Sequence, residues 1–429
     1  MMCKFDDAES QKYRPIWVSI RGIAQDILKD ESKSDVQEGL VSAPLQVEPN
    51  FVGRQDIPAR VEGKFHAPRD RRDFEIALIC ALPLEAECVQ EAFDKFWEDE
   101  GKKYGKAPGD PNAYTTGVIG EHNVVLAYMP GMGTTSAVAV AGCLRVSFSN
   151  IKLALVVGIC GGMPSGTDHE EIVLGDIIIS QALIQYDLGR QYPGGFKRKT
   201  DVRDTLGRPS PEIRALQAKL GTRRYREKLQ NNIAVFLTEV QQKLPKTKCP
   251  GHENDILYRS SYVHQHHPPA TCDECGKDDE MCELALKMEC DDLGCESTMR
   301  VTRNRLMSTS TTPPMVHIGL MGSTNTVMKS GQHRDRVAQA DGIIGFEMEG
   351  AGVWDYFPSI VIKGVCDYAD SHKRKGVATI RRGRRGRVHE SLFSRVECRG
   401  HLVTSTAGTQ KTEQFGCWTR TRKAASKAI

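Results

Sequence analysis

Short apolar runs alternate with helical patterns through the middle of this chain. Runs suited to buried strands lie at 74–81, 123–129, 152–157, 177–180, 315–321 and 360–366. Patterns typical of helices lie between them, at 82–97, 134–148 and 334–340, and a short helix is expected after Glu349. Strands that alternate with helices predict a layered α/β fold in which helices cover a sheet.

Three other parts of the chain depart from this alternation. Residues 1–72 form a polar N-terminal extension that we expect to be partly disordered, and residues 374–429 form a basic tail that we expect to be disordered. Residues 201–312 contain two helical patterns followed by polar sequence rich in cysteine and histidine. The sequence therefore predicts one domain over about 73–373, with a long irregular insertion at about 201–312.

Composition and charge narrow the class of protein. The 429 residues are 39% hydrophobic, enough for a substantial core, and the net charge of +3 hides a mildly acidic body and a basic tail. No apolar run reaches the roughly 18 residues of a membrane span, and MMCKFDDAES lacks the features of a secretory signal. We therefore expect a cytoplasmic protein that makes no contact with a membrane and keeps its 14 cysteines reduced.

Acidic residues gather where the predicted strands end. Glu347 and Glu349 precede a short helix, Asp367 follows the strand 360–366, and Glu85 lies four residues beyond the first strand. Open α/β sheets bind ligands at the carboxyl ends of strands, where carboxylates often act as acids or bases. The alternative is structural, because glutamates favour helix N-termini and an aspartate often begins a turn. Spacing alone slightly favours this structural alternative.

Two glycine turns also lie at strand ends. Gly131 and Gly133 precede one helix, and Gly158 and Gly161 follow the strand at 152–157. Glycine allows the backbone to approach a ligand closely. Neither turn is a Walker A loop, because no Gly-Lys-Ser/Thr follows. By themselves these turns indicate little about function.

The wording of two motifs carries a family resemblance. Phe-Glu-Met-Glu-Gly-Ala-Gly at 346–352 and Cys-Asp-Tyr-Ala-Asp-Ser-His at 366–372 resemble the nucleoside phosphorylase / methylthioadenosine nucleosidase superfamily. The resemblance is strongest to the domain found at the N-terminus of many fungal NLR-like receptors, and it covers about 74–373. It implies a three-layer α/β/α sandwich with a mixed central sheet, and chemistry at the N-glycosidic bond of a nucleoside.

The resemblance also implies a role for each acidic residue. Glu85 matches the acid that deprotonates water, Glu349 the glutamate that binds the ribose hydroxyls, and Asp367 the aspartate that protonates purine N7. A purine leaves poorly as an anion, and positive charge grows on the sugar as the C–N bond breaks, so an acid and nearby carboxylates are both needed. The other residues expected at the ribose and base pocket are Met348, Phe346, Gly131, Gly133, Gly158, Gly161, Asn325 and Val327.

Two departures from the family pattern bear on the reaction. Phosphorylases of the superfamily hold phosphate with an arginine and a serine at positions that here carry Val156 and Ile159, so water is the expected nucleophile. Nucleosidases carry Ser-Gly-Asp/Asn-x-aromatic where residues 323–327 read Ser-Thr-Asn-Thr-Val, which leaves Phe346 or Tyr368 to stack on the base. We therefore expect a purine nucleosidase. A phosphate-dependent phosphorylase and a catalytically weak nucleoside-binding module are the alternatives.

The insertion also contains candidate zinc ligands. They are Cys272, Cys275, Cys282, Cys290, Cys295, His264, His266 and His267. A single Cys-x-x-Cys with irregular later spacing fits structural zinc sites loosely, and free intracellular cysteines in a loop are the more common case. The sequence therefore predicts no cofactor and no metal, and Cys272, Cys275, Cys290 and Cys295 remain weak candidates.

The basic tail has an origin that requires no nucleic acid. Where the family continues Asn-Lys-x-Trp-Gln-x-Tyr-Ala-Ala-Ala, residues 376–387 read GVATIRRGRRGR. The codons GTG GCA ACC ATA CGC CGC GGC, read one base later, encode Trp-Gln-Pro-Tyr-Ala-Ala. The chain from about Lys375 is therefore interpreted as an out-of-frame translation. The expected partner is a small-molecule purine nucleoside or nucleotide, with no specific nucleic acid, and a homo-oligomer stays open.

Overall fold

The computed structural model describes residues 66–372, without 121, 167–169, 244–251, 269–271, 273–274, 276–281 and 308–312, and without the side chains of 235–243. The basic tail and nearly all of the N-terminal extension therefore lie outside the described residues. In the described part, no helix combines the length and the apolar character needed to cross a membrane.

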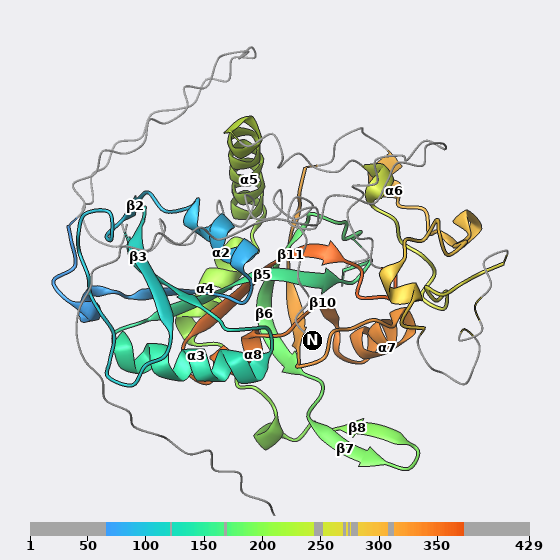
Figure 1. Ribbon diagram of the computed structural model, residues 1–429, viewed down its shortest axis with the longest axis horizontal. Helices are drawn as coiled ribbons and strands as arrows, with labels where there is room; N and C mark the ends of the chain where they lie inside the picture. Colours follow the sequence, from blue (N-terminus) through green and yellow to red (C-terminus); the bar gives the residue numbers. More distant parts are fainter. Residues whose placement is uncertain are drawn as a thin grey trace, which may run out of the picture. The chain divides into compact units, whose positions relative to one another are not determined.

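The described residues form a mixed sheet of nine strands, with the order β10-β9-β6-β11-β5-β1-β4-β3-β2 (Figure 1). Its strands are β1 (Ile76–Cys80), β2 (Lys95–Phe96), β3 (Ala113–Ile119), β4 (His122–Tyr128), β5 (Leu153–Gly162), β6 (Ile177–Gln185), β9 (Val316–Ser323), β10 (Ile343–Glu347) and β11 (Ser359–Asp367). Strands β4, β1, β5 and β11 run parallel to one another, so their carboxyl ends lie at one edge. A separate hairpin, β7 (Gly189–Tyr192) and β8 (Gly195–Arg198), extends away from the sheet (Figure 1).

Helices cover both faces of this sheet. The described helices are α2 (Pro83–Gln90), α3 (Thr134–Ser147), α4 (Pro211–Leu220), α5 (Arg223–Lys243), α6 (Asn304–Met307), α7 (Gly331–Asp341) and α8 (Gly350–Trp354), of which α6 has no buried residue. Alternate residues of β1 show the arrangement. Leu78 belongs to a core shared with α2, α4 and α5, whereas Ile79 belongs to a core shared with α3 and α8. Both faces are buried, so the strand reads as a continuous apolar run, and the predicted three-layer α/β/α sandwich is confirmed.

One half of the sheet closes on itself. Strand β10 pairs with β9 and also, through Gly345 and Phe346, with Gly162 and Gly161 of β5. The strands β5, β11, β6, β9 and β10 therefore form a closed ring of pairings. Gly161 and Gly162 are also packed tightly against β11 and the turn after it, because a Cβ on Gly162 would lie 2.6 Å from Val365 and one on Gly161 would lie 2.8 Å from Ala369. The closure brings β10 against the carboxyl end of β5, and Glu347, the last residue of β10, comes within 3.7 Å of Lys363 in β11.

The structure also modifies several predicted elements. The helix expected at 82–97 ends at Gln90, where the chain turns so that Phe93 stacks on Phe96. The first part of the predicted insertion is regular, because α4 and α5 contribute Ile213 and Leu229 to the main core. Strands β2, β3, β7, β8 and β10 were not expected. In its described residues, the remainder of the insertion contains turns, 3-10 helices and the four-residue helix α6.

Candidate active site

Glu85 lies at the start of α2, just beyond β1, and is almost fully buried. Its Oε2 accepts hydrogen bonds from the amides of Ala81 (2.8 Å) and Leu82 (2.9 Å). Its Oε1 accepts the amide of Ile159 (3.1 Å), in the second glycine turn. The carboxylate therefore caps the helix and also joins the carboxyl ends of β1 and β5.

Lys363 is the central residue of this site, and the sequence analysis missed it. It lies in the middle of β11, opposite Gly158 of β5, and is 1% exposed. Its Nζ donates to Glu349 Oε2 at 2.7 Å and lies 3.7 Å from Glu347 Oε2. A Cβ on Gly158 would lie 2.6 Å from both Glu85 Oε1 and Lys363 Nζ. Glycine at 158 is thus required for the two side chains to meet there.

Glu347 and Glu349 have different surroundings although only one residue separates them. Glu347 Oε2 accepts the amides of Glu349 (3.0 Å) and Gly350 (2.9 Å), so this carboxylate caps the start of α8. Glu349 instead reaches Lys363, and its Oε1 accepts the amide of Gly133 at 3.4 Å. The structural interpretation therefore describes Glu347 well, whereas Glu349 points to the strand ends.

Burial controls the electrostatics of this group of charges. Burial raises the pKa of Glu85 to about 7, against the opposing effect of Lys363. Burial likewise raises the pKa of Glu347. Burial disfavours the charge on Lys363, but Glu349, Glu347 and Glu85 together hold the pKa of Lys363 above its ordinary range. One ammonium therefore faces three carboxylates in a place with little water, where Glu85 exchanges a proton near neutral pH.

Asp367 ends β11 and is half-buried. Its Oδ1 accepts the amide of Ala369 at 2.9 Å, and Cys366 Sγ lies 3.5 Å from its Oδ2. Ala369 has φ of 51°, a left-handed conformation that costs free energy for alanine. Gly161 lies opposite Asp367, and a Cβ there would come within 3.0 Å of Asp367 Oδ1. The turn thus holds the carboxyl against the second glycine turn.

The two glycine turns and the loop after β9 meet around these acids. Gly133, with φ of 107°, begins α3, and a Cβ there would lie 2.8 Å from Asn325 Oδ1. The amide of Asn325 donates to Asp187 Oδ2 at 3.0 Å. The structure thus brings Gly133, Asn325 and Glu349 together, as it brings Gly158 to Glu85 and Gly161 to Asp367.

The remaining residues predicted for the ribose and base pocket differ in how deeply they are buried. Phe346 is 6% exposed and packs edge-on against Tyr186, at 5.7 Å between ring centroids. Tyr368 is also buried, and its hydroxyl donates to Asp255 at 2.6 Å. Met348 is half-buried, Val327 is exposed, and no atom would lie within 4 Å of a Cβ on Gly131.

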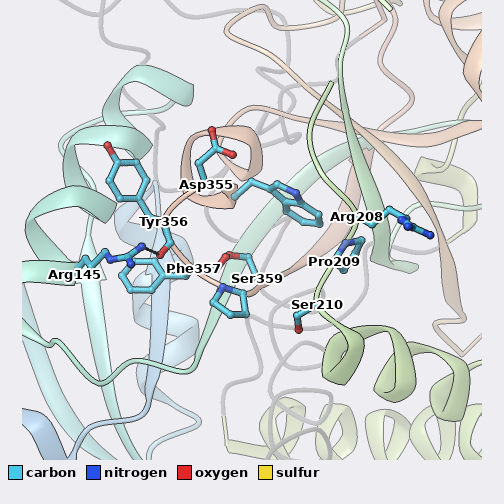
Figure 2. Close-up of a pocket in the computed structure, with 10 residues that line it drawn as sticks. Arg145, Arg208, Pro209, Ser210, Asp355, Tyr356, Phe357 and Ser359 are labelled. Atoms are coloured by element: carbon cyan, nitrogen blue, oxygen red, sulfur yellow. Dashed lines mark hydrogen bonds between the residues drawn. The ribbon is translucent and has the colours of Figure 1, made fainter. Parts of the chain in front are cut away.

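A separate cavity of about 370 Å³ lies at the other end of β11 (Figure 2). Arg145, Arg208, Tyr356 and Ser359 are among its lining residues. Arg145 reaches across to donate to the carbonyl of Tyr356 at 2.6 Å. Ser359 is the first residue of β11 and Asp367 the last, so this cavity is distinct from the acidic site.

Comparison with known proteins yields one family and one close relative in sequence. Residues 75–232 match the phosphorylase superfamily. A nucleotide-binding leucine-rich repeat (NLR)-like protein of Hyaloscypha variabilis is 32% identical over 311 residues, which are 71% of this chain and 27% of that protein. The chain thus spans about a quarter of the length of that relative.

Solved structures give weaker likenesses. A 5'-methylthioadenosine/S-adenosylhomocysteine nucleosidase from S. pneumoniae is 14% identical, with a TM-score of 0.39, and the match covers 70% of this chain and 87% of that one. A futalosine hydrolase of Helicobacter pylori is also 14% identical, with the same coverage and a TM-score of 0.38.

Proposed function

We propose that this chain, whose residues 75–232 match the phosphorylase superfamily, hydrolyses the N-glycosidic bond of a purine nucleoside or nucleotide. The observation that carries this proposal is the placement of carboxylates at the glycine turns of β5. Glu85 and Glu349 meet Lys363 at Gly158, and Asp367 stands at Gly161. Asp367 lies four residues beyond Lys363, with an irregularity of β11 between Val365 and Asp367, so the two positions are roughly 10–13 Å apart at about 3.3 Å per residue. The site thus offers acidic groups to both ends of an elongated ligand.

Each carboxylate has a task in this reaction. Water attacks the anomeric carbon while Glu85 takes its proton, the C–N bond breaks, and Asp367 gives a proton to N7 of the leaving purine. Glu349 accepts hydrogen bonds from the ribose hydroxyls. The pKa of Glu85, raised by burial to about 7, suits a base that must accept and release a proton at neutral pH.

Lys363 positions Glu349. Its ammonium holds one carboxylate oxygen at 2.7 Å, which leaves the direction of the other oxygen fixed toward Gly133. A positive charge at this place also keeps several acidic groups in one buried site, which would otherwise repel one another. The carboxylates are then already oriented when positive charge develops on the sugar. They stabilise this charge without having to reorganise during the reaction.

Charge also favours water over phosphate as nucleophile. Val156, at the family's arginine position, is buried in the core, and the amide of Ile159 is engaged with Glu85. The lysine at this turn, Lys363, already faces Glu347 and Glu349. A phosphate dianion here would meet carboxylates without a cationic fork to hold it. We therefore favour hydrolysis over phosphorolysis as the reaction of this site.

A catalytically weak nucleoside-binding module is the second candidate. It is favoured by the relation to an NLR-like protein about four times longer than the matched part, and by the changed sequence at 323–327. In such a module, the same residues would hold the nucleoside without breaking it. Binding without turnover is the observation that separates this candidate from the nucleosidase.

Substitution of Asp367 tests the assigned roles. Asp367→Asn keeps the shape of the side chain but removes the proton donor, so turnover of a purine nucleoside should fall by roughly 10²–10⁴-fold while binding is retained. Asp355→Asn, an exposed residue at the other end of β11, is the matched control and should retain wild-type turnover. Glu349→Gln should weaken binding and turnover together. A wild-type rate in Asp367→Asn would remove this residue from the reaction.

A further inference from the structure

The later part of the insertion gathers its cysteines and histidines into two groups. Five cysteines between 272 and 295 are described, and all are free thiols. The ligand atoms of His266, Cys272, Cys275 and Cys282 all lie within 4.8 Å of one another. Those of His264, Cys295 and His372 also lie within 4.8 Å of one another. Cysteines and histidines whose spacing along the chain is irregular are thus brought together into two compact groups.

The first group has the dimensions of a tetrahedral zinc site. Zinc binds sulfur at about 2.3 Å and histidine nitrogen at about 2.0–2.1 Å, which places ligand atoms of a tetrahedron roughly 3.5–3.8 Å apart. Cys272 and Cys282 have sulfurs 3.8 Å apart. His266 Nδ1 lies 3.2 Å from Cys275 Sγ and 3.8 Å from Cys282 Sγ. The amide of Ala285 points to Cys282 Sγ at 3.5 Å, a contact that stabilises a thiolate.

The second group has a further donor nearby, Cys290, whose sulfur is not among the three ligand atoms that all lie within 4.8 Å of one another. His264 Nδ1 lies 3.6 Å from Cys290 Sγ and 3.8 Å from Cys295 Sγ. The other ring nitrogen of His264 lies 3.1 Å from the carbonyl of Met288. Metal-binding histidines commonly bond to a backbone carbonyl in this way, which directs the free nitrogen to the metal.

His372 supplies an independent sign of a missing ligand in the second group. It is 8% exposed, and neither of its ring nitrogens has a hydrogen-bond partner among the described residues. A buried polar group without a partner costs roughly 1–3 kcal/mol, so it is rarely left in that state. His372 follows β11, far along the chain from Cys295, yet its ring nitrogen lies beside the Cys295 sulfur.

The apolar core of this segment is too small to explain its order. It consists of Cys282, Ala285 and Leu293, with half-buried neighbours that are mostly the same cysteines. The described helices nearby are 3-10 turns of three residues, such as Ala285–Lys287. Small segments without a sufficient core are commonly held by a disulfide or a metal. A disulfide would bring two sulfurs to about 2.05 Å, well short of the 3.8 Å between Cys272 and Cys282.

We propose that the insertion binds two zinc ions. The ligands are His266, Cys272, Cys275 and Cys282 for the first ion, and His264, Cys290, Cys295 and His372 for the second. The second ion joins the insertion to the segment that follows Asp367. Ser371, beside His372, accepts the amide of His264 at 3.0 Å, so the two segments already contact each other there. The ion thus fixes the backbone that leads out of the candidate active site.

Elemental analysis of the full chain, purified without a histidine tag, tests this proposal. We expect two zinc ions per wild-type chain. The double variants Cys272→Ser/Cys275→Ser and Cys290→Ser/Cys295→Ser should each lose one ion, whereas Cys143→Ser, a half-buried cysteine of α3, should keep both. A wild-type chain without zinc would overturn the proposal, and so would a content that neither double variant lowers. One ion per chain would overturn one of the two sites.

A second measurement covers variants that fail to fold. In the wild-type chain, a strong chelator should release zinc, expose the thiols of the insertion to a thiol reagent, and raise amide exchange at 368–372. Visible absorption typical of an iron–sulfur cluster would show that the cysteines hold a different group from zinc, and it would contradict the proposal. Disulfides between these cysteines in the non-reduced mass would contradict it as well. Thiol reactivity that stays the same after the chelator is added would also contradict the proposal.

Discussion

The buried lysine gives the sharpest test of the site's electrostatics. In Lys363→Met the apolar stem is kept and the ammonium is removed, which leaves Glu349 without its 2.7 Å partner and Glu347 without its cation. Removing one member of a buried ion pair costs about 3–5 kcal/mol, because the remaining charge stays buried without compensation. Lys363 is 1% exposed, so solvent screens this loss very little.

Lys152 provides a matched control. It pairs with Glu75 at the surface, where the two side chains are 65% and 48% exposed. Surface pairs contribute about 0–1 kcal/mol. Urea unfolding followed by circular dichroism should therefore give a free energy of unfolding that is about 3–5 kcal/mol lower in Lys363→Met, and nearly unchanged in Lys152→Met.

The pH dependence adds a second criterion. Without the lysine, the pKa values of Glu85 and Glu347 should rise further, since Lys363 opposes the effect of burial on both. The carboxyls of the variant then become neutral more easily as pH falls. The stability lost in Lys363→Met should consequently be smaller at pH 5 than at pH 8. An equal and small loss in both lysine variants, at both pH values, would refute this account of the site.

Two further predictions follow from Glu85 and from the tail. The pKa of Glu85 in the folded chain is raised from 4.5 to about 7, so the wild type should lose stability as pH rises through this range, and Glu85→Gln should lack that loss. For the same reason, kcat/KM should rise with pH to about 7 in the wild type and lose this limb in Glu85→Gln; an unchanged limb would exclude Glu85 as the base. If the chain is out of frame from about Lys375, replacing the tail with the Trp-Gln-Pro-Tyr-Ala-Ala helix should raise the melting temperature, whereas deleting the tail should change it little. A transcript whose codons, read one base later, do not encode the Trp-Gln-Pro-Tyr-Ala-Ala segment would contradict that interpretation.

Strands buried on both faces were readily predicted from the sequence. The runs at 74–81 and 360–366 are almost wholly apolar, and β1 and β11 fall there. Strand β3 and the hairpin β7–β8 were missed because they are half-exposed, rich in polar residues and glycine, and carry no continuous apolar run. Strand β10 was missed because it is only five residues long and runs directly into the Glu-Met-Glu motif, and its pairing with β5 depends on tertiary closure.

The candidate site was predicted in part. The acidic residues were found from their motifs, but Lys363 was passed over inside an apolar strand. The signal was nonetheless present, since a lone lysine in a strand buried on both faces requires a negative partner. The two cysteine groups were not predicted as metal sites, because the ligands of the first proposed site lie between His264 and Cys290 of the second, and His372 comes from the motif at 366–372 rather than from the insertion. Spacing in sequence cannot reveal such an arrangement.

The fate of the sugar tests the central claim most directly. The full chain is incubated with inosine, adenosine, methylthioadenosine or ATP, with and without phosphate, and both products are identified by mass spectrometry. The proposed hydrolysis predicts the free purine and the free sugar, or its 5'-substituted form, at a rate that does not depend on phosphate. A sugar 1-phosphate that forms only when phosphate is present would contradict the claim, as would bound nucleoside that is never cleaved.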